Sequence, residues 1–137
     1  MRESLKVLQE CAELQQRKSK DYQNEKSRIR QADHYPRGCA TILDMVHQKI
    51  TRIYSVMEAM EAGETANFES LEDSAKDAIN YLSFFVSYSR GKMEGQNPTR
   101  DLVNRPLKID GHQVGGNVAD LSALRTTSVG VLNNDEG

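Results

Sequence analysis

The stretch TILDMVHQKITRIYSVMEAMEA, residues 41–62, decides the fold of this 137-residue chain. Apolar side chains recur in it every three or four residues, which is the period of an α-helix. They are Ile42, Met45, Val46, Ile50, Ile53, Met57 and Met60. Thr41 and Asp44 have the spacing of a capping box, and Gly63 is a natural helix stop. The pattern therefore predicts a helix from Thr41 to Ala62.

Two flanking segments show the same period. Residues 4–20 carry apolar side chains at helical spacing, and residues 67–90 carry a longer stripe of them. The longer stripe consists of Leu71, Ala75, Ala78, Leu82, Phe85 and Val86. Asn67 is a good N-cap, and Gly91 ends the segment. Because the linker 61–66 is short, we expect the second and third helices to pack as an antiparallel hairpin in an all-α fold.

The helix over 41–62 is apolar over an unusually wide arc. The residues in this arc are Ile42, Leu43, Met45, Val46, Ile53, Tyr54, Val56 and Met57. A unit of two or three helices buries little surface by itself, so the excess predicts a helical bundle completed by a second copy of the chain. We therefore expect a homodimer or a higher homo-oligomer.

The sequence changes character after residue 94. Proline and glycine interrupt every short apolar run, including Pro98, Pro106 and Gly111. This predicts a helical domain over residues 1–94 and an extended or weakly structured C-terminal arm over 95–137. Asp110-Gly111 is a hairpin-type turn that could join two short strands within the arm.

Composition limits the partners. The net charge is −2 and the pI is about 5.9, which argues against duplex nucleic acid because such binding shows a basic footprint. The two cysteines have no metal-type spacing. No apolar run is long enough to span a membrane, and MRESLKVLQECAEL lacks the apolar core of a signal peptide. We therefore expect a protein of the reducing cytoplasm.

Three carboxylates follow one another along the third predicted helix. Glu69, Asp73 and Asp77 are spaced i, i+4 and i+8, so they share one face. Carboxylate oxygens suit Mg²⁺, which proteins hold by one or two carboxylates together with substrate phosphates. The alternative is a solvated face, because acidic side chains near a helix N-terminus are stabilising without any ligand.

Two cations lie on the second predicted helix. Lys49 and Arg52 are spaced i, i+3 and could clamp phosphate oxygens together. A solvated face explains this pair equally simply.

Three segments together resemble a known family. They are KDY at 20–22, KITRI at 49–53 and ESLEDSAKDAINY at 69–81. The pattern resembles the phage and bacterial helical domain called nucleotide modification associated domain 1, which is itself similar to the MazG-like all-α nucleotide pyrophosphohydrolases. The resemblance covers about Leu5 to Lys92.

The resemblance implies Mg²⁺-dependent hydrolysis of a nucleoside triphosphate to a monophosphate and pyrophosphate, within phage nucleotide metabolism in a host cytoplasm. Asp73, Asp77 and Tyr81 occupy the places that help to hold Mg²⁺ in MazG-like enzymes. The residues expected to contact the nucleotide are Lys20, Asp21, Tyr22, Lys49, Arg52, Asn80 and Tyr81.

Two alternatives remain open. MazG-like enzymes carry a glutamate pair on the preceding helix, whereas this chain offers Asp44, His47 and Gln48 there. That departure favours a non-catalytic nucleotide-binding protein on the same scaffold. A structural or assembly protein, docking through its C-terminal arm, is the third hypothesis.

Overall fold

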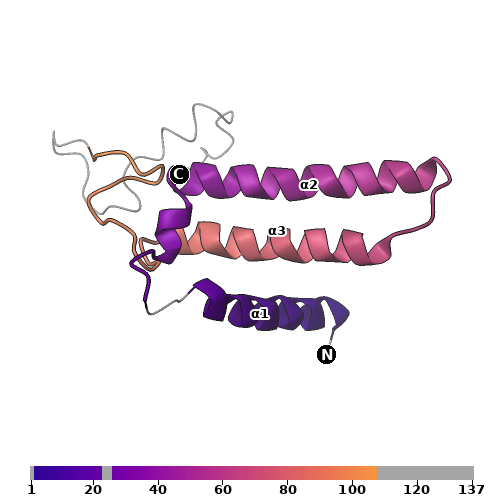
Figure 1. Ribbon diagram of the computed structural model, residues 1–137, viewed down its shortest axis with the longest axis horizontal. Coiled ribbons are helices and arrows are strands. Elements are labelled where there is room, and N and C mark those ends of the chain that lie inside the picture. The colour runs from indigo at the N-terminus through magenta and orange to yellow at the C-terminus, as the bar shows by residue number, and fades with distance from the viewer. Residues whose placement is uncertain (1, 23–25, 108–137) are drawn as a thin grey trace. The chain divides into compact units, whose positions relative to one another are not determined.

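The computed structural model describes residues 2–22 and 26–107, except for the side chains of Asp21 and Tyr22. The described residues form three long helices, α1 (Glu3–Tyr22), α2 (Cys39–Glu61) and α3 (Phe68–Ser89), and a short 3₁₀ helix, η1 (Gln31–His34) (Figure 1). No strand occurs among them. The all-α fold class is therefore confirmed.

The ends of the helices show why the sequence forms them there. The Asn67 side chain accepts a hydrogen bond from the Ser70 backbone amide at 3.1 Å, which confirms the predicted N-cap of α3. Helix α2 stops before Gly63, whose φ of 97° favours glycine. At its other end, α2 begins two residues earlier than predicted. The Thr41 hydroxyl accepts a hydrogen bond from the Arg37 amide at 2.9 Å.

The chain divides into two compact units, and both α2 and α3 run through the boundary between them. The first, here called the helical unit, comprises residues 1–30 and 42–85. The second, here called the loop unit, comprises among the described residues 31–41 and 86–107. This division differs from a boundary at residue 94, because residues 31–41, which lie between the two segments of the helical unit, belong to the loop unit together with residues that follow α3.

The helical unit has a thin core. Among its described residues, the buried apolar side chains are those of Cys11, Ile42 and Ala78. Many large apolar side chains of the same unit remain exposed: Leu5, Leu8, Ile29, Leu43, Ile50, Tyr54, Met57, Phe68 and Leu82. The amphipathic stripes of these helices are thus only partly covered within one chain.

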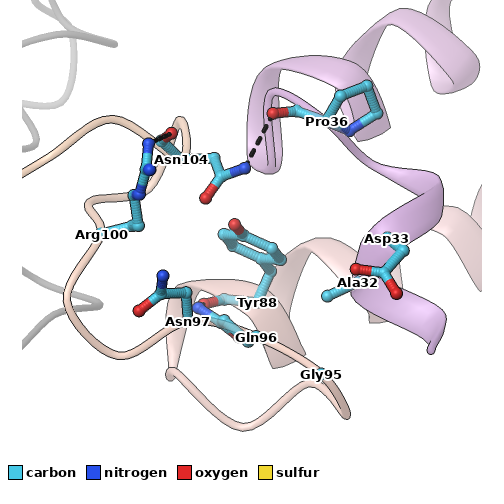
Figure 2. Close-up of a pocket in the computed structure, with 9 residues that line it drawn as sticks. All are labelled: Ala32, Asp33, Pro36, Tyr88, Gly95, Gln96, Asn97, Arg100 and Asn104. Atoms are coloured by element: carbon cyan, nitrogen blue, oxygen red, sulfur yellow. Dashed lines mark hydrogen bonds between the residues drawn. The ribbon is translucent and has the colours of Figure 1, made fainter. Parts of the chain in front are cut away.

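The loop unit is packed more densely around Tyr88, which Figure 2 shows between the 31–36 segment and the 95–104 segment. Its buried apolar side chains are those of Tyr35, Cys39, Tyr88, Met93 and Leu102. Backbone hydrogen bonds join its two segments: the Cys39 amide donates to the Leu102 carbonyl at 2.9 Å, and the Ala32 amide to the Glu94 carbonyl at 3.0 Å.

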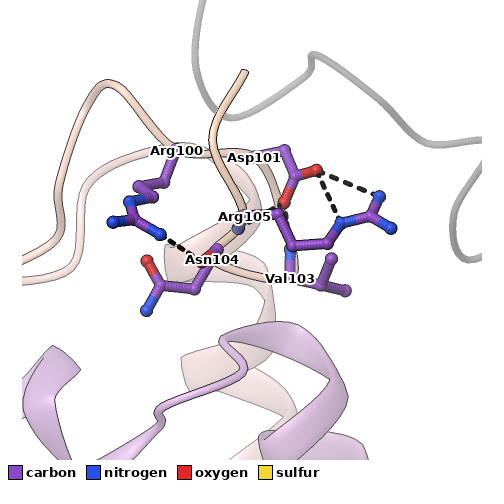
Figure 3. Close-up of polar contacts among 5 residues, drawn as sticks. All are labelled: Arg100, Asp101, Val103, Asn104 and Arg105. Carbon is purple, nitrogen blue, oxygen red and sulfur yellow. Dashed lines mark hydrogen bonds and ion pairs between the residues drawn. The ribbon is translucent and has the colours of Figure 1, made fainter. Parts of the chain in front are cut away.

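Asp101 organises the loop that closes this unit (Figure 3). Its buried carboxylate accepts hydrogen bonds from the Val103 amide at 2.9 Å and the Arg105 amide at 3.0 Å. The Arg105 guanidinium adds a contact at 3.1 Å. Residues 95–107 therefore form a tight loop, where the sequence had suggested the start of an extended arm. The turn expected at Asp110-Gly111 lies outside the described residues.

Candidate functional site

Three helices of the helical unit each bring one charged side chain to a common point. Asp77 of α3 lies 3.0 Å from the Lys49 ammonium of α2 and 3.6 Å from the Lys18 ammonium of α1. We call these three residues the lysine–aspartate cluster. The Asp77 side chain is 23% exposed, so the cluster is partly shielded but open to solvent. Two ammonium groups and one carboxylate leave it with a local charge of +1.

One turn further along α3, an amide pair continues this polar seam. Gln15 of α1 donates from Nε2 to Asn80 Oδ1 at 3.2 Å and to Ser83 Oγ at 3.1 Å. Ser83 Oγ in turn donates to the Asn80 carbonyl at 2.7 Å. These contacts hold the Asn80 side chain in one orientation.

Asn80 is only 9% exposed, yet the structure gives its Nδ2 group no acceptor among the described residues. A buried amide donor without an acceptor costs free energy, on the order of 1–3 kcal/mol. Such a group indicates a site that a ligand or ordered water completes. Asn80 follows Asp77 by three residues on the same helix, so the two side chains share one face of α3.

The predicted nucleotide residues are distributed unevenly around this cluster. Lys49 and Asn80 belong to the polar seam, whereas Lys20 and Arg52 are exposed and contact none of its described residues. Tyr81 packs edge-to-face against Phe84, with ring centroids 6.0 Å apart. The side chains of the remaining two, Asp21 and Tyr22, lie outside the described part of the chain.

The predicted metal-binding residues also differ in their surroundings. Asp77 is paired with the two lysines, while Glu69 and Asp73 are exposed on the preceding turns of α3. Within residues 2–22 and 26–107, no group of three or more histidine, cysteine, aspartate or glutamate side chains could hold a metal ion. One carboxylate fits Mg²⁺ only together with other oxygens, such as phosphates.

Two groups of the helical unit, Cys11 and Lys76, have shifted pKa values. Burial raises the pKa of the Cys11 thiol, which the Lys76 charge offsets in part. A hydrogen bond from Lys76 to Glu10, at 2.8 Å, raises the pKa of that ammonium. Cys11 is thus held as a neutral thiol at pH 7 and is poorly suited to act as a nucleophile.

Sequence reasoning missed Lys18 and Gln15 as members of the site. Both lie on α1, three residues apart, so helical spacing places them on one face. That spacing was visible in the sequence. The signal that α1 turns this face toward Asp77 and Asn80 was not, since polar side chains at a helix end are ordinarily solvated.

Comparisons with known proteins found no match: no family model, no curated protein and no solved structure matches this chain. In the part of the chain that the structure describes, no helix combines the length and the apolarity needed to cross a membrane.

Proposed function

We propose that this chain binds a nucleotide, or another small phosphorylated ligand, at the lysine–aspartate cluster. The observation that carries the proposal is the position of two ammonium groups, from Lys18 and Lys49, on either side of one carboxylate. Their excess positive charge suits phosphate oxygens. The unused Nδ2 donor of Asn80 offers a hydrogen bond to the same ligand.

Binding would also change existing contacts. Asp77 serves as the counter-ion of both lysines. A phosphate group would compete with Asp77 for the ammonium groups. The resemblance of segments 20–22, 49–53 and 69–81 to the nucleotide modification associated domain supports a nucleotide as the ligand.

The test is binding of dTTP, dATP, dGTP and dCTP to the full chain, measured by calorimetry in EDTA. Lys49→Gln should weaken binding by about tenfold or more, because a hydrogen bond to a charged group is lost. Lys6→Gln removes the same charge from an exposed site on α1 and should leave affinity within about twofold. Equal affinity of Lys49→Gln and the parent chain would exclude the cluster as the phosphate site.

Mg²⁺-dependent hydrolysis of a nucleoside triphosphate is the second candidate. The observation in its favour is that Asp73 and Asp77 lie one turn apart on the same face of α3. Asp77→Asn separates the two candidates. If the site only binds phosphate, removing this negative charge tightens binding severalfold. If Asp77 holds Mg²⁺ with the substrate, the same variant loses pyrophosphate release.

We further propose that a second copy of the chain completes the bundle, extending the antiparallel pairing of α2 and α3 that their short linker predicts. The helical unit buries few apolar residues, while α2 exposes Leu43, Ile50, Tyr54 and Met57. Leu43, Ile50 and Met57 follow one another at intervals of seven residues. Tyr54 comes four residues after Ile50 and three residues before Met57. This is the repeat by which two helices pack together in a coiled coil, so an identical α2 helix is the occupant that fits.

Sedimentation of the full chain tests this assembly. The Tyr54 side chain is 63% exposed, so Tyr54→Glu should leave one chain folded and yet weaken the dimer by about tenfold or more. Ser55→Glu adds the same charge to the neighbouring, exposed position off the stripe and should leave the dimer intact. A monomeric parent chain at micromolar concentration would overturn the assembly while leaving the nucleotide proposal standing.

A further inference from the structure

The loop unit contains a cavity of about 460 cubic ångströms that is not part of the proposed nucleotide site. Figure 2 shows its walls, which come from the 31–36 segment, from Tyr88 near the end of α3, and from the 95–104 segment. The volume falls within the range of small-molecule sites. All of its lining residues belong to the loop unit.

The cavity holds a buried hydroxyl that has no hydrogen-bond partner among the described residues. Tyr88 is 2% exposed, and the structure gives its Oη atom no hydrogen bond within residues 2–22 and 26–107. Figure 2 shows this hydroxyl directed into the space beside Asn104 and Arg100. Burial raises the pKa of the Tyr88 hydroxyl, so at neutral pH the group is a hydrogen-bond donor. Buried tyrosine hydroxyls ordinarily find a partner.

Arg100 supplies a cation on the same side of the cavity. Its Nη1 donates to the Asn104 carbonyl at 3.1 Å, and no described carboxylate pairs with its guanidinium. The neighbouring carboxylate, Asp101, is committed to Arg105 at 3.1 Å. A guanidinium has five N–H donors, so Arg100 keeps most of its donors for a ligand.

Two asparagine side chains, those of Asn97 and Asn104, line the end of the cavity near Arg100. Asn104 is fixed by donation from Nδ2 to the Pro36 carbonyl at 2.9 Å. The Asn97 Oδ1 atom accepts from the Thr99 amide at 2.9 Å and from its hydroxyl at 2.7 Å, so the Nδ2 group of Asn97 is left to donate. The donors at this end are the Arg100 guanidinium, the Tyr88 hydroxyl and the Asn97 Nδ2 group, and the Asn104 Oδ1 atom is an acceptor beside them.

We propose that this cavity binds a small organic anion, whose carboxylate or phosphate group contacts the Arg100 guanidinium and the Tyr88 hydroxyl. An oxyanion provides the several acceptor oxygens that these donors lack. Asp33 lies in the opposite wall and would repel a negative charge placed there. The anionic group therefore takes the Arg100 end. This proposal is independent of the nucleotide site, because the two share no residue.

The experiment is a titration of the full chain, followed by nuclear magnetic resonance, with inorganic phosphate in one arm and acetate in the other. Chloride holds the ionic strength constant. We expect saturable shifts at the Arg100 Nε–H signal and at the backbone amides of residues 95–104. Saturation by phosphate alone identifies a phosphate ester as the ligand class, and saturation by acetate identifies a carboxylate. Linear, unsaturated shifts in both arms would overturn the proposal.

Two variants locate the binding. Arg100→Gln should weaken it by about tenfold or more, whereas Arg90→Gln, an exposed arginine of the same unit outside the cavity, should not change it. Tyr88→Phe removes only the unpartnered hydroxyl, so it should weaken binding severalfold without lowering Tm. A fall in Tm for Tyr88→Phe would show that the hydroxyl already has a partner in the free protein, and would contradict the proposal.

Discussion

The helical unit and the loop unit differ in how they combine regular structure with burial. The helical unit consists mostly of three long helices, yet its buried apolar residues in the described chain are only Cys11, Ile42 and Ala78. The described residues of the loop unit include little regular structure, yet they bury Tyr35, Cys39, Tyr88, Met93 and Leu102. Helical periodicity in a sequence therefore does not locate the densest packing. In the loop unit, we expect close packing between irregular segments to provide the stability that hydrogen-bonded helices provide in the helical unit.

The most damaging change should be Gly38→Ala in the loop unit. Gly38 has a φ of 55°, and an added Cβ would lie 2.5 Å from the Leu102 carbonyl oxygen and 2.7 Å from the Tyr88 ring. Backbone strain and overpacking together should lower the free energy of unfolding by about 3 kcal/mol or more. Urea denaturation followed by tyrosine fluorescence would measure this loss.

Gly63→Ala is the matched control in the helical unit. Gly63 also has a positive φ, 97°, but a Cβ there would meet nothing within 4 Å. Only the strain of about 1 kcal/mol should remain. Equal losses for the two variants would mean that the dense packing around Gly38 contributes nothing, and the contrast between the units would fail.

A smaller loss is expected for Asp101→Asn. The buried Asp101 carboxylate accepts bonds from two backbone amides and from Arg105, and an amide group replaces one of its acceptor oxygens by a donor. We expect a loss of about 2 kcal/mol in thermal or urea unfolding. Arg105→Gln should cost under about 1 kcal/mol, because the Arg105 side chain is 53% exposed and solvent screens its charge. A larger loss for Arg105→Gln would show that the ion pair, rather than the backbone bonds, holds the loop.

The sequence predicted the helices well because their signals are local. Apolar spacing, the Asn67 cap and the Gly63 stop all act within a few residues. The loop unit could not be predicted in this way. Its contacts join residues far apart in the chain, such as Cys39 with Leu102 and Pro36 with Asn104. Proline and glycine near residue 100 indicated irregular backbone correctly, but they say nothing about burial.

The candidate site was predictable in part for the same reason. Asp77 follows from spacing on one helix, Asn80 from the family resemblance, and Lys49 from the cations of the preceding helix. Lys18 required knowledge of how α1 turns about its own axis, which depends on tertiary packing. The buried Tyr88 hydroxyl left no signal in the sequence, because it matters only through what surrounds it.

The two cysteines offer a direct comparison of the units, because Cys11 belongs to one and Cys39 to the other. In single-cysteine variants, the other cysteine being replaced by alanine, Cys11 should react with Ellman's reagent about tenfold faster than Cys39. The thinner core should open at lower free energy. Both thiols should react equally in urea, which controls for intrinsic reactivity. Faster labelling of Cys39 would reverse the ranking.

The same variants test a pH dependence of the loop unit. Burial raises the pKa of Cys39 from 9.0 to about 12, so the fold favours the neutral thiol. This contribution is fully present below pH 9 and is lost as pH rises from 9 toward 12. Burial also raises the pKa of Tyr88, which acts in the same direction. Cys39→Ala should therefore flatten the alkaline decline in Tm, whereas Cys11→Ala should flatten it less.

A small effect is expected at the N-cap of α3. Asn67→Ala removes the hydrogen bond to the Ser70 amide and should cost about 1 kcal/mol in thermal unfolding, while Asn67→Asp keeps an acceptor and should cost little. This cap belongs to the helical unit, so the loss should accelerate labelling of Cys11 and leave Cys39 unchanged. If both thiols accelerate together, the two units unfold as one, because α2 and α3 continue through both of them.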